Sequence, residues 1–195
     1  MAAVRQSPTR PGCVKKGTVG RPAWTQRVGR NGGGHFREGR VVAWGPMSDV
    51  DVNAPCLGCG IVSGATRPVG GVLARSAGLV LHGVASPSPL PGWVVLTSVR
   101  HARALYDLDD EAARELGPFA ARVMRAQREV LGAEHAYAFA IGDVLRHFHL
   151  HLVPRYRDTP QRLWGRGAFE GTPGDLRPEA ELEAAARALA AALGG

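Results

Sequence analysis

The sequence contains few cysteines and no long apolar stretch, and each absence excludes a class of protein. The chain of 195 residues has three cysteines, and one of them, Cys13, is far from the other two. A disulfide framework is therefore not expected, and a reducing, cytoplasmic compartment is the better prediction. No apolar run approaches the roughly 18–20 residues that a membrane helix requires, so no membrane partner is expected.

Acidic residues are almost missing from the first 46 residues. This segment has nine Lys and Arg and one acid, Glu38, whereas the remaining chain holds 15 basic and 16 acidic residues. The net charge of +7 therefore belongs to the segment, and nucleic acid is expected to bind weakly, if at all, through it. Rich in Gly, Pro and Arg and without periodicity, residues 1–46 are predicted to be a disordered basic tail or a stretch before a true start at Met47. Residues 47–195 are long enough for one domain.

Four segments of this domain have the patterns of β-strands. Two short strands around a Ser-Ala-Gly turn are predicted within 72–85, and a buried strand at 93–99. Segments 136–142 and 147–156 alternate between apolar and other residues with period 2 and are joined by a short turn with a glycine. They predict an antiparallel pair.

Two other segments have helical spacing. Acids in the first turn and apolar residues three or four positions apart predict a helix over 107–132, which Pro118 should kink or effectively start. A polar stretch covers 157–177, and Pro178 is then predicted to open a C-terminal helix.

The stretch "HFHLHL" places a histidine at every second position, at His147, His149 and His151. On a strand these three imidazoles line one face, while Phe148 and the leucines anchor the other face in the core. One histidine is more often a structural hydrogen-bonding residue, but three in register predict a functional surface. A single catalytic metal held by all three is disfavoured, because about 13–14 Å separates the outer pair on a strand.

The second cluster is "CLGC", with Cys56 and Cys59. Such a pair is half of a zinc site, a redox pair or a chance occurrence. A redox pair of this type should follow a strand and lie at the start of a helix. The neighbouring Pro and Gly residues do not suggest such a strand and helix. Zinc needs two further ligands, and the remaining histidines of the domain are His82, His101 and His135. His101 ends a predicted strand, which is a rigid position for a ligand.

Together these segments resemble the histidine triad (HIT) family of nucleotide hydrolases and transferases. The family signature is H-φ-H-φ-H-φ-φ, where φ is apolar, and residues 147–153 match every position. The resemblance covers about residues 54–156 and includes "CLGCGIVSG" and "PLPGWVVLTSVRH". It implies an α+β fold, with an antiparallel sheet of about five strands, one main helix and a C-terminal helix. It also implies a homodimer.

The resemblance implies a role for each histidine of the triad. His149 would attack the α-phosphorus of a nucleoside phosphate and form a covalent nucleotidyl-histidine, and His151 would contact the phosphate or the leaving oxygen. Neutral imidazole is a good nucleophile near pH 7, which agrees with this chemistry. In zinc-bearing members the first histidine joins the C-x-x-C pair. The implied ligands of a structural zinc are Cys56, Cys59, His101 and His147, and a hydrogen-bond relay is the other role open to His147.

The expected phosphate cradle differs from the family pattern. Gly142 matches, but Asp143 replaces a glutamine and Val144 a hydroxyl residue. An acid beside a polyphosphate is unfavourable. Arginines could compensate, because guanidinium pairs bidentately with phosphate, but each one singly is more often a solvated surface charge. The candidates are Arg146, Arg155, Arg157, Arg162 and Arg166. Trp93 and Trp164 could stack on a base, and a core or lid role is equally open to them. The altered cradle leaves open a nucleotide-binding scaffold or sensor with little turnover, beside the enzyme and a metallohydrolase that uses the histidine strand.

Overall fold

The computed structural model describes residues 56–84 and 87–194, and the prediction for residues 1–46 lies outside them. The described part is an α+β domain built on one antiparallel sheet with the strand order β1-β2-β3-β5-β4. Short 3-10 helices, η3 to η6, lie between the longer elements. The longer elements are α1 (Leu57–Ser63), β1 (Val72–Ser76), β2 (Leu79–Gly83), β3 (Val94–Ser98), α2 (Asp110–Leu131), β4 (His135–Phe139), β5 (His149–Arg155) and α3 (Glu179–Ala192).

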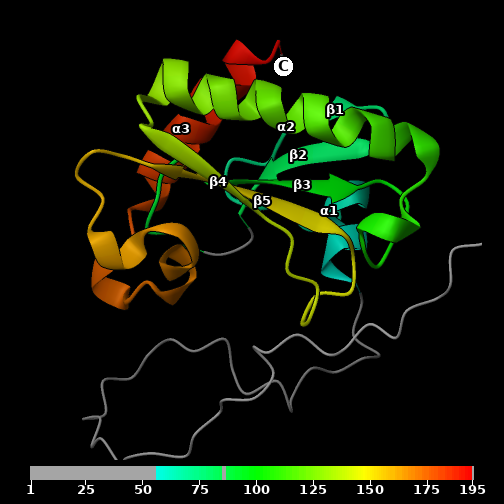
Figure 1. Ribbon diagram of the computed structural model, residues 1–195, viewed down its shortest axis with the longest axis horizontal. Coiled ribbons are helices and arrows are strands. Elements are labelled where there is room, and N and C mark those ends of the chain that lie inside the picture. Colours follow the sequence, from blue (N-terminus) through cyan, green and yellow to red (C-terminus); the bar gives the residue numbers. More distant parts are fainter. Residues whose placement is uncertain (1–55, 85–86, 195) are drawn as a thin grey trace, which may run out of the picture. The chain divides into compact units, whose positions relative to one another are not determined.

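Both faces of the sheet are covered, by different elements (Figure 1). Helices α2 and α3 pack on one face, where alternate strand residues form the main core with the apolar side of α2. Helix α1 and the 3-10 helices that follow β5 lie on the opposite face (Figure 1). The fully buried members of the main core include Leu79, Leu81, Leu96, Phe119, Val123, Leu152 and Leu189.

The predicted strand pairs are confirmed. A two-residue turn joins β1 to β2, with φ of 36° at Ala77 and 76° at Gly78, the left-handed conformation that suits a tight hairpin. Strands β4 and β5 are antiparallel, with His135 opposite Arg155 and Phe139 opposite His151. The predicted α+β fold with a five-stranded sheet, a main helix and a C-terminal helix is therefore correct.

Helix α2 begins at Asp110, with the side chain of Asp109 accepting a hydrogen bond from the backbone N–H of Ala112. It ends at Gly132, which has a φ of 73°. Pro118 lies inside it on the exposed side. The alternative that Pro118 starts the helix is wrong, because the helix already starts at Asp110, eight residues earlier, with Asp109 as its N-cap.

Helix α1 was not predicted. Its sequence "LGCGIVS" holds two glycines in seven residues, and Cys56 is its N-cap residue. The expectation that the cysteine pair does not open a helix is therefore wrong. Tertiary contacts outweigh the poor helix propensity: Ile61 is buried, and Arg75 donates to the carbonyl of Val62. No helix in the described ranges is both long and apolar enough to cross a membrane.

The polar stretch 157–177 folds into three 3-10 helices: η4 (Gln161–Leu163), η5 (Gly165–Glu170) and η6 (Pro173–Asp175). An ion pair between Arg162 and Asp175 ties the two ends of this segment together. Ala168 packs into a second core cluster with Leu90, Trp93 and Val153. The segment thereby forms a fixed cover over the sheet face that carries the triad.

Candidate functional site

Two cysteines and two histidines from three distant segments meet at the N-terminal end of α1. Their four ligand atoms all lie within 4.8 Å of one another. The residues of this cluster are Cys56, Cys59, His101 and His147. In the described part of the chain it is the one group of three or more His, Cys, Asp or Glu residues arranged to hold a metal ion.

The spacing within this cluster fits a tetrahedral zinc site. The Sγ atom of Cys56 lies 3.3 Å from Nδ1 of His147, and Sγ of Cys59 lies 3.3 Å from Nδ1 of His101 and 3.6 Å from Nδ1 of His147. Bonds of about 2.3 Å to sulfur and about 2.0–2.1 Å to nitrogen place tetrahedral ligands about 3.5 Å apart. Four protein ligands close the shell, so the site fits a structural rather than a catalytic zinc.

The surroundings of His147 orient it for this cluster. Its Nε2–H donates to the carbonyl of Ser98 at 2.8 Å, which leaves Nδ1 unprotonated toward the cysteines. The ring is fully buried, and burial lowers its pKa, which favours the neutral form that binds metal. Gly58 permits the close approach of α1, because a Cβ at that position would lie 2.5 Å from the ring of His147.

The other two histidines considered as zinc ligands lie elsewhere. His82 is buried on β2, where its Nδ1–H donates to the carbonyl of Gly83 at 2.6 Å and Nε2 accepts from the hydroxyl of Thr97 at 2.8 Å. Burial lowers its pKa to about 4, so this ring stays neutral. His135 is exposed on β4 beside Tyr137. The structure therefore separates both from the cluster.

His149 begins β5, with its side chain on the sheet face opposite the main helix. Its cross-strand neighbour is Thr97, and the side chains of such a pair share one face. Nδ1–H of His149 donates to the carbonyl of His147 at 2.7 Å. A neutral ring in this tautomer has its lone pair on Nε2, which is the form that a nucleophile requires.

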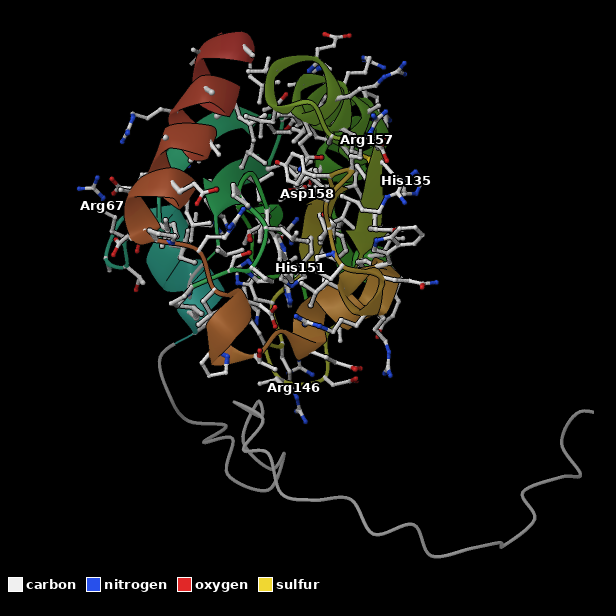
Figure 2. The ribbon with its side chains drawn as sticks, turned by 90° about the vertical axis from the view of Figure 1, so that its left-hand side faces the viewer. Arg67, His135, Arg146, His151, Arg157 and Asp158 are labelled. Carbon is white, nitrogen blue, oxygen red and sulfur yellow. The ribbon has the colours of Figure 1, made fainter. Side chains whose placement is uncertain are left out.

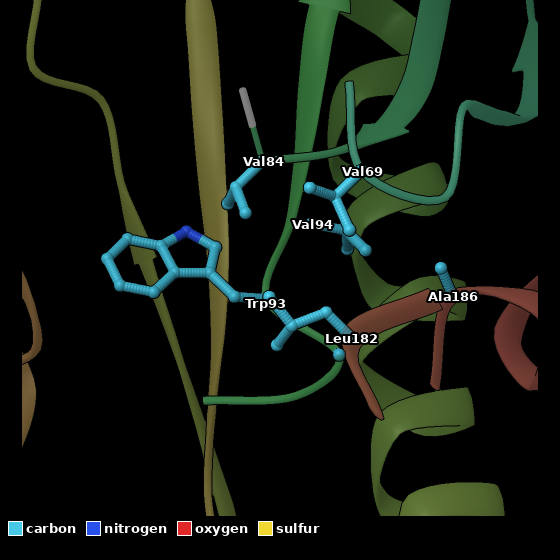
Figure 3. A pocket seen from close by; sticks show the side chains of 8 residues that line it. Val69, Val84, Trp93, Val94, Leu182 and Ala186 are labelled. Carbon is cyan, nitrogen blue, oxygen red and sulfur yellow. The ribbon is translucent and has the colours of Figure 1, made fainter. Parts of the chain in front are cut away.

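His151 follows on the same face, with its ring centroid 5.0 Å from that of His149. The indole N–H of Trp93 donates to its Nδ1 at 3.1 Å, and the ring of Phe169 lies edge-on at 5.2 Å. Burial, with His149 and His82 nearby, lowers the pKa of His151 to about 3. Figure 2 shows His151 within the domain, whereas Arg146 extends outward. A small hollow behind Trp93, lined mainly by apolar side chains, has a volume of about 10 Å³ and cannot hold a nucleotide (Figure 3).

The residues predicted to contact phosphate occupy two different places. Gly142, Asp143, Val144 and Arg146 are exposed in the loop that leads to the triad. Arg155 lies at the far end of β5, where it pairs with Glu134 and covers the ring of Trp164 at 4.3 Å. The structure therefore places the loop of residues 142–146 beside the triad, whereas Arg155 lies away from it.

The other candidate arginines are also paired with carboxylates. Arg157 pairs with Glu134, Arg162 with Asp175, and Arg166 with Glu170. Within residues 56–84 and 87–194, no carboxylate forms an ion pair with Arg146. Among these candidate arginines, Arg146 is therefore the one whose guanidinium forms no ion pair with a described carboxylate. It is also directly next to the triad in the sequence.

No protein-family model and no curated protein sequence matches the chain. Several solved structures, in contrast, are similar to the chain. A zinc-bound histidine triad family protein from Mycobacterium smegmatis has a TM-score of 0.55 and 23% identity, over 71% of this chain and 93% of that one. A Hit-like protein involved in cell-cycle regulation from Bartonella henselae has a TM-score of 0.54 and 17% identity, over 68% and 92%.

A hypothetical histidine triad nucleotide-binding protein from Sulfolobus tokodaii has a TM-score of 0.54 and 14% identity, over 71% of this chain and 92% of that one. At these identities the likeness concerns the fold. The chain has the fold of histidine triad proteins, and its sequence carries the complete triad motif.

Proposed function

We propose that this chain is a zinc-stabilised histidine triad enzyme that hydrolyses or transfers nucleoside phosphates through a covalent intermediate on His149. The observation that carries the proposal is the hydrogen bond of 2.7 Å from Nδ1 of His149 to the carbonyl of His147. It fixes the proton on one nitrogen of the ring and leaves the lone pair on the other. Support also comes from the fold, which this chain shares with a nucleotide-binding protein.

The reaction has two displacements at the α-phosphorus. Nε2 of His149 forms a bond to phosphorus while the bond to the leaving group breaks, and the leaving group departs with that electron pair. Water or another acceptor then attacks phosphorus, the bond to Nε2 breaks, and the proton of the acceptor passes to solvent. The Nε2–P bond requires no base, since the neutral imidazole already has its lone pair. In the first step the bond that breaks is a phosphoanhydride P–O bond or a phosphoramidate P–N bond, and the nitrogen of a phosphoramidate takes a proton from solvent and leaves as the amine.

His151 acts beside the reacting phosphorus as a neutral hydrogen-bond donor in this proposal. Its low pKa, caused mainly by burial, means that it carries no positive charge near pH 7. A fixed neutral donor in a site shielded from water still stabilises negative charge that develops on phosphate oxygens. Arg146 supplies a positive charge for binding the substrate phosphate, because it is the candidate arginine with no ion pair among the described residues.

The cluster of Cys56, Cys59, His101 and His147 would hold zinc. When bound, the metal supplies a cross-link between α1 and the start of the catalytic strand. The chain's own residues prepare this site: Gly58 admits the ring of His147, and Ser98 fixes its tautomer.

The test is a rapid acid-free quench after mixing with dinucleoside polyphosphate or with AMP phosphoramidate. We expect an acid-labile adenylyl adduct on His149 in mass spectra, and loss of adduct and turnover in His149→Ala. The matched control is His135→Ala, which removes an exposed histidine of β4 and should retain both. Turnover that survives His149→Ala refutes the covalent mechanism.

A nucleotide-binding protein with little turnover is the second candidate. It is supported by the ion pairs that occupy most of the arginines near the triad segment. This candidate predicts one round of adduct formation, or binding alone, without further product. Steady-state release of nucleoside monophosphate over many turnovers excludes it.

A further inference from the structure

Trp93 makes the one side-chain hydrogen bond to His151 among the described residues. We propose that Trp93 is a positioning residue whose indole N–H holds His151 in the tautomer with its proton on Nε2. Only the expected effect on kcat rests on the proposed function. The tautomer of His151 is measured without substrate and does not depend on it. Neither the triad motif nor the zinc cluster includes Trp93.

The chemistry of the two rings decides the direction of this hydrogen bond. The indole nitrogen is only ever a donor, and it lies 3.1 Å from Nδ1 of His151. Nδ1 must therefore be the acceptor and carry no proton. A neutral imidazole has one ring proton, so this contact places it on Nε2.

The surroundings of His151 favour the neutral ring. Trp93, Phe169 and His149 all lie edge-on to it, with centroids at 5.7, 5.2 and 5.0 Å. Phe139 is its cross-strand neighbour on β4 and shares its face of the sheet. None of these neighbours is a carboxylate that could stabilise a protonated His151. This agrees with the lowered pKa of His151.

The indole itself is fixed in place. Trp93 is 8% exposed, and the ring of Phe169 meets it edge-on at 4.8 Å and 82°. The hollow on the side of Leu182 and Ala186 has room for about one water molecule and not for an indole (Figure 3). The donor therefore cannot swing away from His151 without opening the second core cluster.

A fixed tautomer has a consequence for catalysis. With Nδ1 engaged by Trp93, Nε2–H is the donor that His151 can offer to a phosphate oxygen. Without the indole N–H, the neutral ring is free to place its proton on either nitrogen, and part of the population lacks a proton at Nε2. Removing one donor of this kind commonly costs about 100-fold or more in kcat, so a partial loss of the donor is expected to cost about 10-fold.

The experiment is nitrogen NMR of the ring nitrogens in the full chain labelled with ¹⁵N-histidine at pH 7. The signals of His151 are assigned as those missing in His151→Gln. In the parent protein we expect unprotonated Nδ1 and protonated Nε2. In Trp93→Phe, which keeps an aromatic ring but no donor, we expect the two nitrogen shifts to move toward each other. In kinetics we expect kcat to fall about 10-fold with KM within about 2-fold.

The matched control is Trp164→Phe. Its indole also donates a hydrogen bond, at 2.9 Å to the carbonyl of Thr159, but it contacts Arg155 rather than His151. This variant should leave the His151 signals unchanged. Should Trp93→Phe lose its fold, a benzothienyl analogue of tryptophan at position 93 replaces N–H by sulfur and keeps the shape.

Three results would overturn the proposal. The first is a protonated Nδ1 on His151 in the parent protein. The second is an unchanged His151 spectrum in the donor-free variant. The third is a spectrum that moves while kcat stays within 2-fold, because Trp93 would then set a tautomer that turnover does not need. A parent protein that lacks turnover contradicts the proposed function instead, and the NMR result still tests Trp93.

Discussion

His149 and His147 are joined by a hydrogen bond of 2.7 Å from the ring of one to the backbone carbonyl of the other. The side chain of His147 belongs to the metal-binding cluster, while its carbonyl orients the ring of His149, the nucleophile of the proposed mechanism. One residue thus connects the metal-binding cluster to the imidazole that is proposed to react. Loss of the cluster should therefore lower activity as well as stability.

Removing the cysteine ligands should remove zinc and weaken the fold. Cys56→Ser combined with Cys59→Ser is expected to lower zinc from about one ion per chain to none, and the free energy of unfolding by at least about 2 kcal/mol, because metal-binding energy is folding energy. Elemental analysis and urea unfolding measure the two quantities. Cys13→Ser is the matched control and should keep its zinc. A double variant with full zinc content contradicts the ligand assignment.

Arg146→Ala should weaken substrate binding more than it slows the chemical step. The guanidinium has no carboxylate partner in the described part of the chain, so it is free to contact phosphate. We expect KM to rise about 10-fold with kcat within about 3-fold. Arg157→Ala, which removes an arginine paired with Glu134, should change KM less than about 2-fold. Equal effects of the two variants would show that Arg146 has no particular role.

Acid should destabilise the domain partly through His82. Burial lowers its pKa from 6.5 to about 4, so between these values the unfolded chain takes up a proton that the folded chain does not. This contribution to stability is complete above pH 6.5 and falls by about 1.4 kcal/mol per pH unit as the pH drops toward 4. Urea unfolding at pH 7, 6 and 5 should show a shallower slope in His82→Gln. The exposed His135→Gln should match the parent slope, and identical slopes in all three proteins would refute the assignment.

Gln127 should contribute strongly to stability although it is polar. It is fully buried on α2, and its side-chain amide donates to the carbonyls of Gly92 at 2.9 Å and Leu152 at 3.0 Å. Gln127→Leu leaves both acceptors without this donor and is expected to cost about 2–3 kcal/mol. Glu129→Leu changes an exposed position on the same helix and should cost less than about 0.5 kcal/mol. Equal melting temperatures for the two variants would contradict this role.

The strands and long helices could be predicted because their patterns are local. Period-two alternation predicts the β4–β5 pair, and spacing of three and four with Gly132 at the end predicts α2. The same alternation predicts that His149 and His151 share one face of the sheet. The zinc ligands follow from the family resemblance, and the structure brings the four side chains together.

The rest depends on contacts between distant segments. Helix α1 has too few residues and too many glycines for a helix signal, and it forms against the ring of His147. Phe169 lies in a polar stretch, so nothing in its neighbours indicates that its ring lies against His151. For Arg155 the sequence allows a phosphate contact or a solvated surface position, and only the register of β4 and β5 places Glu134 beside it.

The central claim is that His149 carries the nucleotidyl group between the leaving group and water. Hydrolysis of a substrate with a chiral α-phosphorothioate in ¹⁸O-water tests it most directly, because each in-line displacement inverts the configuration at phosphorus. Two displacements, through His149, predict net retention. Net inversion would show a single direct attack by water and would contradict the covalent role of His149.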